Sequence, residues 1–490
     1  MRFAALACTL VGACSNEALV FQPVIELPSA RDQNDAPEDA NPFAGSISRI
    51  ELSVLSSGRE VKSQSYARGE SIELTEFPFG EDLVIQMRGF DADRVLAFGR
   101  TCSFELSAET HPAPHLFFST IATFADRPQR SARQDGHGLA LDGMGLFIGG
   151  HDNTGELTTV DVFDPATGEA RALAGTLAPR TGEMVALREA ASSYLVFGGE
   201  GAGAELLETV DASGVRQAAA PHEMGRVLAT ATSLGAGSGD DIIVIGGRCV
   251  DAGCTCAGTT CADNPLAKNV YGLRSSQPGD SWTASMLAPR MSHTATRLGT
   301  DPGAPILVAG GVDSAGATVD QIEIVEPYRR TSTRVPADEM EPAVVLKAPR
   351  SRHHAPLLRD GSVVIIGGVD TVGQAVTTIE RFSLVEDPDE ELPELAAELG
   401  AIDMTETRLP DGRILFTGGR RDAGGPPLDT AFIVDVGVAS STISVLRTAN
   451  LSTPRAGHQA VLLCDGTVLI TGGTADEKLV ERYNPIEVGR

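Results

Sequence analysis

A short apolar run that ends in two glycines occurs seven times along this chain of 490 residues. Successive copies lie 49, 48, 64, 57, 51 and 54 residues apart, which is about the length that a four-stranded antiparallel sheet requires. The apolar run is typical of a buried strand, and glycine allows backbone conformations and close chain contacts that other residues do not. We therefore assign these glycines an architectural role and no chemistry. They are Gly149, Gly150, Gly198, Gly199, Gly246, Gly247, Gly310, Gly311, Gly367, Gly368, Gly418, Gly419, Gly472 and Gly473.

Other features keep phase with the diglycine. A strand that begins with Arg, often followed three residues later by His, precedes it, and an Asp-Gly turn such as Asp142-Gly143 separates the two strands in several copies. Because the histidines recur at one place in the repeat, we expect them to make equivalent structural hydrogen bonds rather than to bind a metal ion. The clearest pairs are Arg290 with His293, Arg350 with His353 and Arg455 with His458.

This order of elements resembles the Kelch repeat over residues from about 119 to 490. The family's aromatic residue after the diglycine is met by Phe163, Tyr328, Phe382 and Tyr483, and its tryptophan only by Trp282. The resemblance implies an all-β fold, with a seven-bladed Kelch-type β-propeller at residues 116–490. The last copy has little chain left for a fourth strand, so we expect residues 116–124 to supply it and close the array.

The N-terminus resembles a bacterial lipoprotein signal. Residues 1–13 contain one Arg, an apolar run and small residues before Cys14, which the resemblance makes the acylated residue of the mature chain. Ser15 favours sorting to the outer membrane. Residues 14–44 are polar, acidic and contain Pro, and they predict a flexible tether. No later segment has the roughly 20 apolar residues of a membrane span, so we expect acyl chains to be the sole membrane contact.

Short alternating apolar runs between residues 45 and 115 predict a small β-sandwich, which loosely resembles immunoglobulin-like or prealbumin-like modules. Asp91 and Asp93 follow one of these runs. Two aspartates in a hairpin are more typical of turn formers than of calcium ligands.

Four cysteines gather in an insertion after the third diglycine, separated by four, one and four residues. Paired zinc ligands have a different spacing, so in an exported chain we expect two disulfides, with three pairings open and a metal site as the alternative. The four are Cys249, Cys254, Cys256 and Cys261. Cys102 and Cys464 lie in strand-like segments, and we expect them to be buried thiols.

The formal net charge of −27 argues against nucleic acid and against adhesion to anionic lipid, since both need clustered Lys and Arg. A solvated acidic surface is the simplest reading of this charge. The acidic stretch from Glu386 to Glu398 interrupts the fifth copy and is predicted to be a solvated helix or loop. Its other acidic residues include Asp387, Asp389, Glu390, Glu391 and Glu394.

No catalytic constellation is visible. Galactose oxidase is a Kelch-type propeller with a copper site built from Tyr, His and Cys, but here the five Tyr are scattered and four cysteines share one loop. We expect a monomeric, envelope-anchored scaffold without cofactor or metal that binds a protein or glycan through irregular segments such as 248–270 and 385–400. The alternative is a carbohydrate-active envelope enzyme with a pocket at the propeller channel.

Overall fold

The computed structural model describes most of the chain. The residues that it leaves undescribed are 1–7, 11–18, 22, 29–40, 44, 73–76, 111, 129–132, 189–190, 220–224, 236–241, 251–254, 257–258, 261–265, 267, 274–280, 336–342, 385–391, 393, 397–398, 400–401, 437–441, 475–478 and 486–490. The predicted lipidation site Cys14 and most of the predicted tether fall among these residues. The described part of the chain is all-β, contains no α-helix and so offers no apolar helix of membrane-spanning length.

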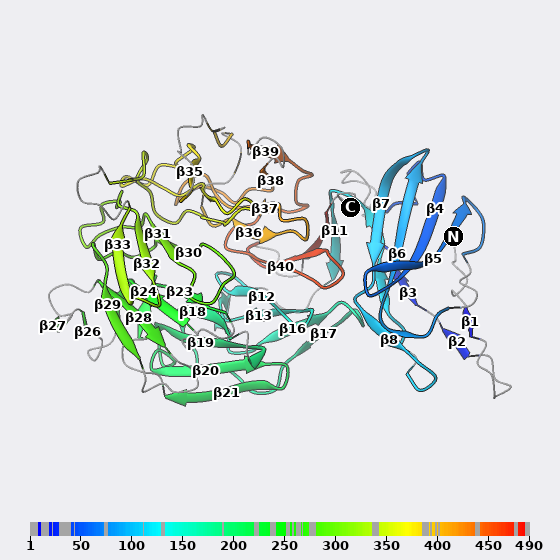
Figure 1. Cartoon of the computed structure of the whole chain (residues 1–490), viewed down its shortest axis with the longest axis horizontal. Coiled ribbons are helices and arrows are strands. Elements are labelled where there is room, and N and C mark those ends of the chain that lie inside the picture. Colours follow the sequence, from blue (N-terminus) through cyan, green and yellow to red (C-terminus); the bar gives the residue numbers. More distant parts are fainter. Residues whose placement is uncertain are drawn as a thin grey trace.

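Residues 45–115, predicted as a small β-sandwich, contribute most of one six-stranded antiparallel sheet, which we call the N-terminal sheet (Figure 1). Its strands run in the order β10 (Ser119–Thr120), β7 (Arg94–Arg100), β6 (Gly80–Asp91), β4 (Arg49–Ser56) and β5 (Arg59–Ala67), and β8 (Phe104–Leu106) pairs with the start of β6. Alternate residues of β4 and β6, such as Leu52 and Ile85, pack in one hydrophobic cluster with Leu116 and Phe118. Asp91 ends β6 and Asp93 lies in the β6–β7 turn, and the Asp91 carboxylate accepts a hydrogen bond from the Ser46 hydroxyl at 2.9 Å.

Short paired strands accompany the larger sheets. Parallel strands β3 (Val24–Glu26) and β9 (His115–Phe117) lie beside the N-terminal sheet. The remaining short pairs are β1 (Cys8–Leu10) with β2 (Leu19–Phe21), β14 (His151–Asp152) with β15 (Gly155–Glu156), β22 (Arg226–Val227) with β25 (Arg248–Cys249), and β26 (Thr255–Cys256) with β27 (Thr259–Thr260).

Each diglycine belongs to its own small antiparallel sheet, numbered here 1 to 7 in the order of the diglycines. Sheet 1 is β12 (His137–Leu141), β13 (Met144–Ile148), β16 (Asp161–Asp164) and β17 (Glu169–Ala172), and sheet 2 is β18 (Thr181–Arg188), β19 (Ser193–Glu200), β20 (Leu206–Asp211) and β21 (Gly214–Ala219). Sheet 3 is β23 (Thr230–Ser233), β24 (Ile242–Ile245), β28 (Asn269–Leu273) and β29 (Trp282–Ser285), and sheet 4 is β30 (Thr294–Arg297), β31 (Ile306–Ala309), β32 (Glu323–Glu326) and β33 (Thr331–Arg334).

The last three sheets follow the same order with variations. Sheet 5 has β34 (Val363–Ile365) and β35 (Glu380–Phe382), with isolated bridges from His354, Leu357 and Glu394 in place of its outer strands. Sheet 6 is β36 (Thr405–Arg408), β37 (Ile414–Thr417), β38 (Ala431–Val436) and β39 (Ile443–Arg447). Sheet 7 is β40 (Gln459–Leu462), β41 (Val468–Thr471), β42 (Leu479–Asn484) and β11 (Thr123–Pro128).

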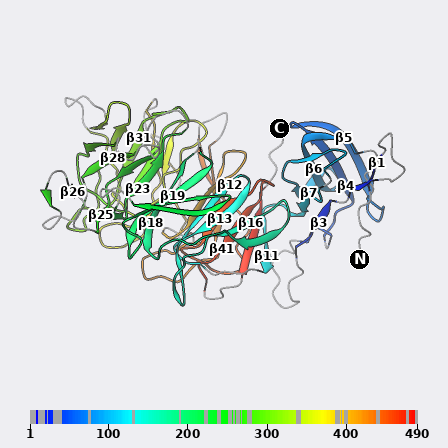
Figure 2. The same ribbon diagram turned by 90° about the horizontal axis from the view of Figure 1, so that it is seen from below.

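Successive sheets pack face to face, as Figures 1 and 2 show for the larger part of the molecule. The second strand of each sheet is apolar on both faces, so its side chains alternate between the clusters shared with the preceding and the following sheet. Val308 of sheet 4 contacts sheet 3, for example, whereas Leu307 contacts sheet 5. Sheet 7 likewise shares a cluster with sheet 1, where Phe147 packs with Val461 and Leu469.

The sheets have two distinct ends. Because successive strands run antiparallel, the turns between strands 1 and 2 and between strands 3 and 4 lie at one end, which we call the Asp-Gly end. The diglycines, the segments between strands 2 and 3 and the segments that lead to the next sheet lie at the opposite end, the diglycine end. Of the segments predicted to carry specificity, 248–270 connects strands 2 and 3 of sheet 3 and so belongs to the diglycine end. Segment 385–400 follows strand 3 of sheet 5 and precedes the Glu394 bridge that replaces strand 4, so it starts from the Asp-Gly end.

Sheet 7 takes its outermost strand from far upstream, as predicted. β11 pairs antiparallel with β42 from Thr123 to Pro128. The predicted strand 116–124 was placed too early, because residues 115–120 pair with β3 and β7 instead. Residues 119–120 complete the N-terminal sheet, residues 115–117 pair with β3 beside it, and only the chain after them is free to join sheet 7.

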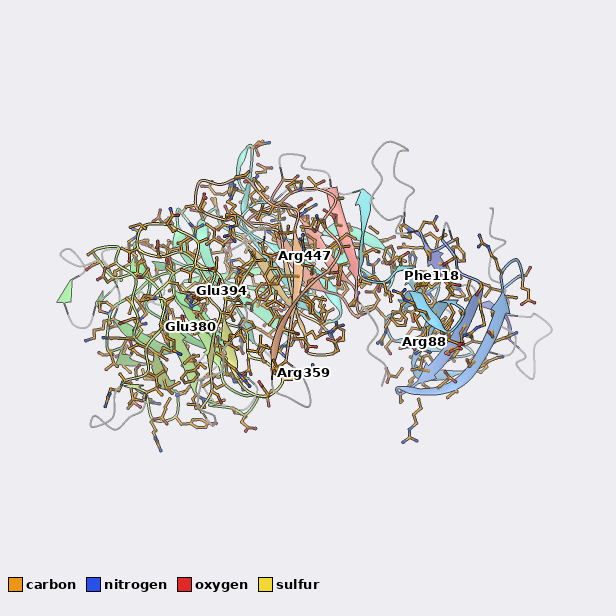
Figure 3. The ribbon with its side chains drawn as sticks, turned by 90° about the horizontal axis from the view of Figure 1, so that it is seen from above. Arg88, Phe118, Arg359, Glu380, Glu394 and Arg447 are labelled. Carbon is orange, nitrogen blue, oxygen red and sulfur yellow. A yellow bond between two sulfur atoms is a disulfide. The ribbon has the colours of Figure 1, made fainter. Side chains whose placement is uncertain are left out.

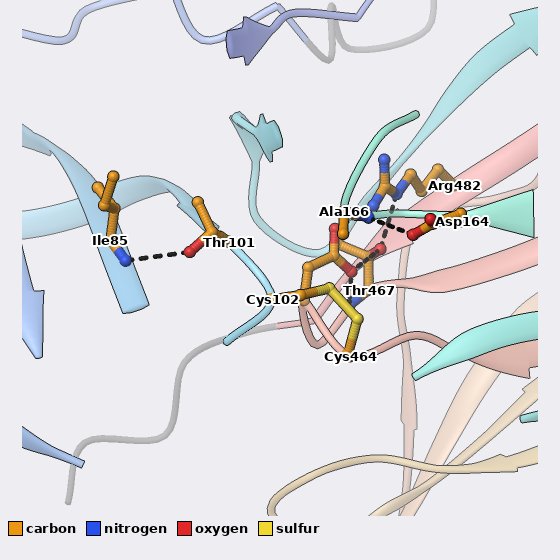
Figure 4. Close-up of a disulfide and its surroundings, with 9 residues drawn as sticks. Ile85, Thr101, Cys102, Asp164, Ala166, Cys464, Thr467 and Arg482 are labelled. Carbon is orange, nitrogen blue, oxygen red and sulfur yellow. Dashed lines mark hydrogen bonds and ion pairs between the residues drawn. A yellow bond between two sulfur atoms is a disulfide. The ribbon is translucent and has the colours of Figure 1, made fainter. Parts of the chain in front are cut away.

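A disulfide joins the N-terminal sheet to sheet 7 (Figure 4). Cys102, just after β7, is bonded to Cys464 in the Asp-Gly end of sheet 7, with a Cα–Cα distance of 5.1 Å. The prediction of two buried thiols was wrong, because the two cysteines form a disulfide. Both residues are buried or nearly so, as expected, but the two chain segments approach each other at these positions. Their sequence separation of 362 residues hides this proximity.

Polar contacts surround the disulfide. Arg482 forms a buried ion pair with Asp465, and its guanidinium lies 4.4 Å from the ring centre of Phe117 in β9. The Asn484 side-chain amide donates to the carbonyl oxygens of Phe98 and Ser119 at 2.8 and 3.0 Å. The N-terminal sheet thus contacts the Asp-Gly end of sheet 7, and the neighbouring β9 contacts that of sheet 1, where His115 N donates to Ala166 O at 3.2 Å. These contacts leave the diglycine end uncovered. Figure 3 places Arg88 and Phe118 in this sheet, apart from Glu380 and Glu394 of sheet 5.

Candidate functional site

The repeated arginines are buried and hold the diglycine turns. In six of the sheets, an Arg guanidinium donates to the carbonyl oxygen of the first glycine, as Arg290 does to Gly310 at 3.1 Å. The six are Arg133, Arg180, Arg226, Arg290, Arg350 and Arg455. Since buried carbonyl groups need partners, these arginines explain how the crowded turns remain satisfied.

A carboxylate on the third strand pairs with five of these arginines. Arg290 and Glu323, both 0% exposed, form an ion pair at 2.5 Å. Burial lowers the pKa of Arg290, while Glu323 opposes that shift. The carboxylates are Asp161, Glu208, Glu323, Glu380 and Glu481. Together, Arg, glycine carbonyl and carboxylate form a structural unit in which every charge is compensated.

Sheets 3 and 6 depart from this unit. By strand register, Tyr271 stands in sheet 3 where the other sheets have the carboxylate, and Phe432 stands there in sheet 6. Sheet 6 also has Ala401 in the sequence where the others have the arginine. Phe432 stacks on Phe416, with ring centres 5.0 Å apart. In sheet 6 an apolar contact therefore replaces both charges at once.

The recurrent histidines make the predicted equivalent hydrogen bonds. Each reaches a threonine on the first strand of the preceding sheet: His293 to Thr230 at 3.2 Å, His353 to Thr294 at 2.9 Å and His458 to Thr405 at 2.5 Å. Burial, followed by the nearby Arg290, lowers the pKa of His293 to about 3. These rings are therefore neutral near pH 7 and link neighbouring sheets. Among the described residues, no group of His, Cys, Asp or Glu is arranged to hold a metal ion.

One position of each repeat packs against the second glycine of the diglycine, and we call it the anchor position. At Gly311, where φ is +92°, an added Cβ would lie 2.9 Å from the Cβ of His293 and 2.6 Å from the carbonyl oxygen of Met291. A side chain would therefore be both strained and crowded there. The anchor residues are Gly136, Glu183, Ala229, His293, His353, Met404 and His458.

The residue before each anchor has a positive φ, and we call these seven residues the positive-φ set. They are Asp135, Gly182, Leu228, Ser292, Arg352, Asp403 and Gly457. Backbone hydrogen bonds connect several of them across sheets, such as Ser292 N to Leu228 O and Arg352 N to Ser292 O. Five are not glycine, which costs free energy at each and is a feature that functional sites often share.

Charged and apolar side chains project from this set at the diglycine end. Arg352 pairs with Asp403 at 2.6 Å, and the Leu228 side chain is 49% exposed. Burial of its carboxyl group raises the pKa of Asp135. The charge of His151 opposes this shift, and the negative charge of Asp403 adds to it. A protonatable carboxyl, an ion pair and an exposed leucine thus lie together, where a partner could contact them.

A cavity of about 600 Å³ lies nearby at the same end, between sheets 2 and 3. Its lining includes Glu205 and Val250, with Glu200 ion-paired to Arg248. Cys249, also in the lining, is disulfide-bonded. Of the other predicted disulfide residues, Cys254 and Cys261 lie outside the described residues, and only the backbone of Cys256 is described.

The acidic stretch is described only in part. Asp387, Asp389, Glu390 and Glu391 lie outside the described residues. Glu394 is exposed and forms a bridge to Thr378, so this part continues sheet 5 rather than forming a separate site.

Sequence reasoning missed the third-strand carboxylates and the positive-φ set. The carboxylates lie between 9 and 13 residues after the first glycine, because the intervening segments differ in length. A search for a fixed spacing therefore fails, although an acidic residue among the first three residues of the third strand is a usable signal in five of the seven sheets. The positive-φ set contains residues as different as Leu228 and Arg352, and no residue type marks it.

No family model matches the chain, and no curated protein matches it. A solved structure titled "Structure of YjhT" is similar to it, with a TM-score of 0.45 and 13% sequence identity. The alignment covers 65% of this chain and 99% of that chain. A likeness at this level carries no argument about function.

Proposed function

We propose that residues 116–490 form a seven-bladed Kelch-type β-propeller that acts as a binding scaffold. The seven diglycine sheets are its blades. The hydrophobic clusters between successive sheets, together with the cluster that sheet 7 shares with sheet 1, support a circular arrangement. β11 then completes the last blade and removes an exposed edge.

The observation that carries the binding role is the difference between the two ends. The N-terminal sheet contacts the Asp-Gly end, whereas segment 248–270 and the positive-φ set lie at the diglycine end. The repeated Arg, Glu and His side chains are used by the structure itself and are not free for chemistry. The diglycine end is therefore the face through which we propose that a protein or glycan partner is bound.

Export and anchoring through Cys14 belong to the same proposal. The Cys102–Cys464 bond and the disulfide at Cys249 support an oxidising compartment, because such bonds are rare in the cytosol. The mass of the membrane-extracted protein tests this part. A diacylated chain that begins at Cys14 is expected, and an unmodified chain would refute the anchor.

Site-specific photo-crosslinking tests which face binds. A benzoylphenylalanine at Leu228 samples the diglycine end, and one at Ala212, an exposed residue at the Asp-Gly end, is the matched control. The full chain is presented with envelope glycans and envelope proteins. Adducts of one defined partner at position 228 and none at position 212 are expected. Equal adducts at both positions would contradict the proposed face.

A carbohydrate-active envelope enzyme is the second candidate, favoured by Asp135. A carboxyl with a raised pKa near Asp403 is suited to proton transfer. Turnover of an envelope glycan, lost on Asp135→Asn with binding retained, would establish this candidate over the scaffold.

A further inference from the structure

A second cavity, of about 270 Å³, opens at the Asp-Gly end between the first strands of sheets 4, 5 and 6. We call it the axial pocket. Its charged lining residues are Arg297, Glu406 and Arg408, and its apolar wall includes Leu357 and Ile414. It lies at the opposite end from the positive-φ set. Sites for drug-sized ligands usually occupy roughly 300–1,000 Å³, so this pocket suits a smaller molecule.

The repeat itself indicates that the fold does not require these charges. Glu406 is the second residue after the anchor position of sheet 6, and the other sheets have small or apolar residues there. These are Gly138, Val185, Ala231, Ala295, Ala355 and Ala460. Four residues after the anchor, Arg297 and Arg408 stand where the other sheets have Ala140, Leu187, Ser233, Leu357 and Leu462. Three charges that architecture does not need therefore line one cavity.

The two guanidinium groups are held by backbone contacts. Arg297 donates to the carbonyl oxygens of Thr300 and Asp301 at 2.6 and 2.8 Å. Arg408 donates to the carbonyl oxygen of Leu357. The Nε of Arg297 is buried without a hydrogen-bond partner. Because each guanidinium has five N–H groups in a rigid fork, donors remain for an anionic ligand.

Glu406 supplies the opposite chemistry. Its Oε2 lies 3.1 Å from Nδ1 of His354, and its side chain is 40% exposed. The His354 ring is in turn held edge-on against Phe416. One carboxylate oxygen is thus oriented by the imidazole, while the other can accept a hydrogen bond from a ligand hydroxyl or ammonium group.

We propose that the axial pocket binds a small organic acid that also carries a hydroxyl or ammonium group. Its carboxylate contacts Arg297 and Arg408, where charge-assisted bonds are strong, and its donor group contacts Glu406. The net charge of −27 repels anions at long range, so affinity depends on these direct contacts.

Titration calorimetry on the full chain tests the proposal with L-malate and L-serine as probes and glycerol as the neutral control. Saturable binding of at least one acid, with none for glycerol, is expected. Arg408→Ala is expected to weaken binding at least about tenfold, the loss of roughly one charged contact. Glu406→Gln is also expected to weaken it. Arg94→Ala, an exposed arginine of the N-terminal sheet, is the matched control and leaves affinity unchanged.

Absence of saturable binding for both acids would overturn the proposal, as would wild-type affinity in Arg408→Ala. Arg408→Lys guards against a folding defect, because it keeps the charge and removes the planar fork. Its affinity is expected between those of the wild type and Arg408→Ala. The crosslinking experiment addresses the other end of the molecule, so either proposal can fail while the other stands.

Discussion

Arg290 and Glu323 show how much of this structure rests on fully buried charge. Each is 0% exposed, and Glu323 also accepts hydrogen bonds from Leu287 N and the Ser332 hydroxyl. A buried ion pair adds little net stability over an apolar pair, but breaking it leaves one charge uncompensated. The pair therefore shows its importance mainly in variants that remove one of the two charges, which we expect to be strongly destabilised.

Glu323→Gln is expected to lower the free energy of unfolding by about 3–5 kcal/mol, because Arg290 keeps its buried charge without a counter-charge. Denaturant titration measures the loss. Glu326→Gln is the matched control: its partner Arg329 is 75% exposed, so a change of about 0–1 kcal/mol is expected. Equal effects in the two variants would contradict the role assigned to burial.

The buried histidines predict a loss of stability in mild acid. The pKa of His293 is lowered to about 3 in the folded chain, whereas the unfolded chain binds a proton near pH 6.5. Below that pH the unfolded state holds more protons, so stability falls as pH falls from about 6.5 towards 3. His293 contributes up to about 1.4 kcal/mol per pH unit in this window. His353 and His458, whose pKa values burial also lowers, act in the same direction.

Comparing wild type with His293→Gln isolates this contribution. Unfolding free energies are measured by denaturant titration at several pH values between about 4 and 7. The unfolding free energy of the variant is expected to depend less steeply on pH, by the equivalent of one bound proton. Identical pH dependence in the two proteins would mean that His293 does not titrate on unfolding.

At the level of single residues, the sequence predicted the histidine bonds but not their ionic neighbours. Each of these His residues follows its arginine by three residues, just before the first strand of its sheet. The carboxylates lie across a segment of variable length, so their partnership appears only when the strands are paired. The positive-φ set was equally hidden, because backbone conformation there follows from packing between sheets.

Among the elements, the pairing of β11 with β42 is the one that joins distant parts of the chain. Six residue pairs connect the two strands, and the ring of Phe124 lies 4.8 Å from that of Tyr483. Asn484, at the end of β42, ties this strand to the N-terminal sheet. The predicted donor strand overlapped the observed one only at Thr123 and Phe124, since competition from β3 and β7 cannot be judged from local pattern.

Asn484→Ala is expected to lower the free energy of unfolding by about 1–3 kcal/mol, because Phe98 and Ser119 lose a buried donor. Hydrogen exchange should rise first in β42 and β11. Ser213→Ala, in an exposed turn of sheet 2, is the control. Unchanged exchange in β42 would show that Asn484 does not secure this strand.

At the scale of the whole molecule, the Cys102–Cys464 disulfide is the feature that sequence reasoning got wrong. Each cysteine lies near a strand end in its own segment, and the local sequence around one cysteine does not indicate the other as its partner. Their proximity depends on where the last sheet meets the N-terminal sheet, which is a property of the complete array. The repeat count, by contrast, could be predicted because each diglycine reports on its own sheet.

Replacing both cysteines with serine is expected to lower the free energy of unfolding by an amount on the order of 5 kcal/mol, since the bond closes a loop across 362 residues. Calorimetry of the oxidised proteins measures the change. In the variant that lacks both cysteines, the N-terminal sheet is also expected to unfold in a thermal transition separate from that of the seven sheets. An unchanged midpoint would mean that noncovalent contacts alone hold the two parts together.

The same bond decides how the molecule bears a mechanical load. If the N-terminus is held and the C-terminus is pulled, the chain upstream of the bond can be drawn out only as far as Cys102. There the tension passes through sulfur to Cys464 and enters sheet 7 directly. Sheets 1 to 6 lie within the covalent loop, off the line of force, and cannot be unravelled one after another from their upstream end.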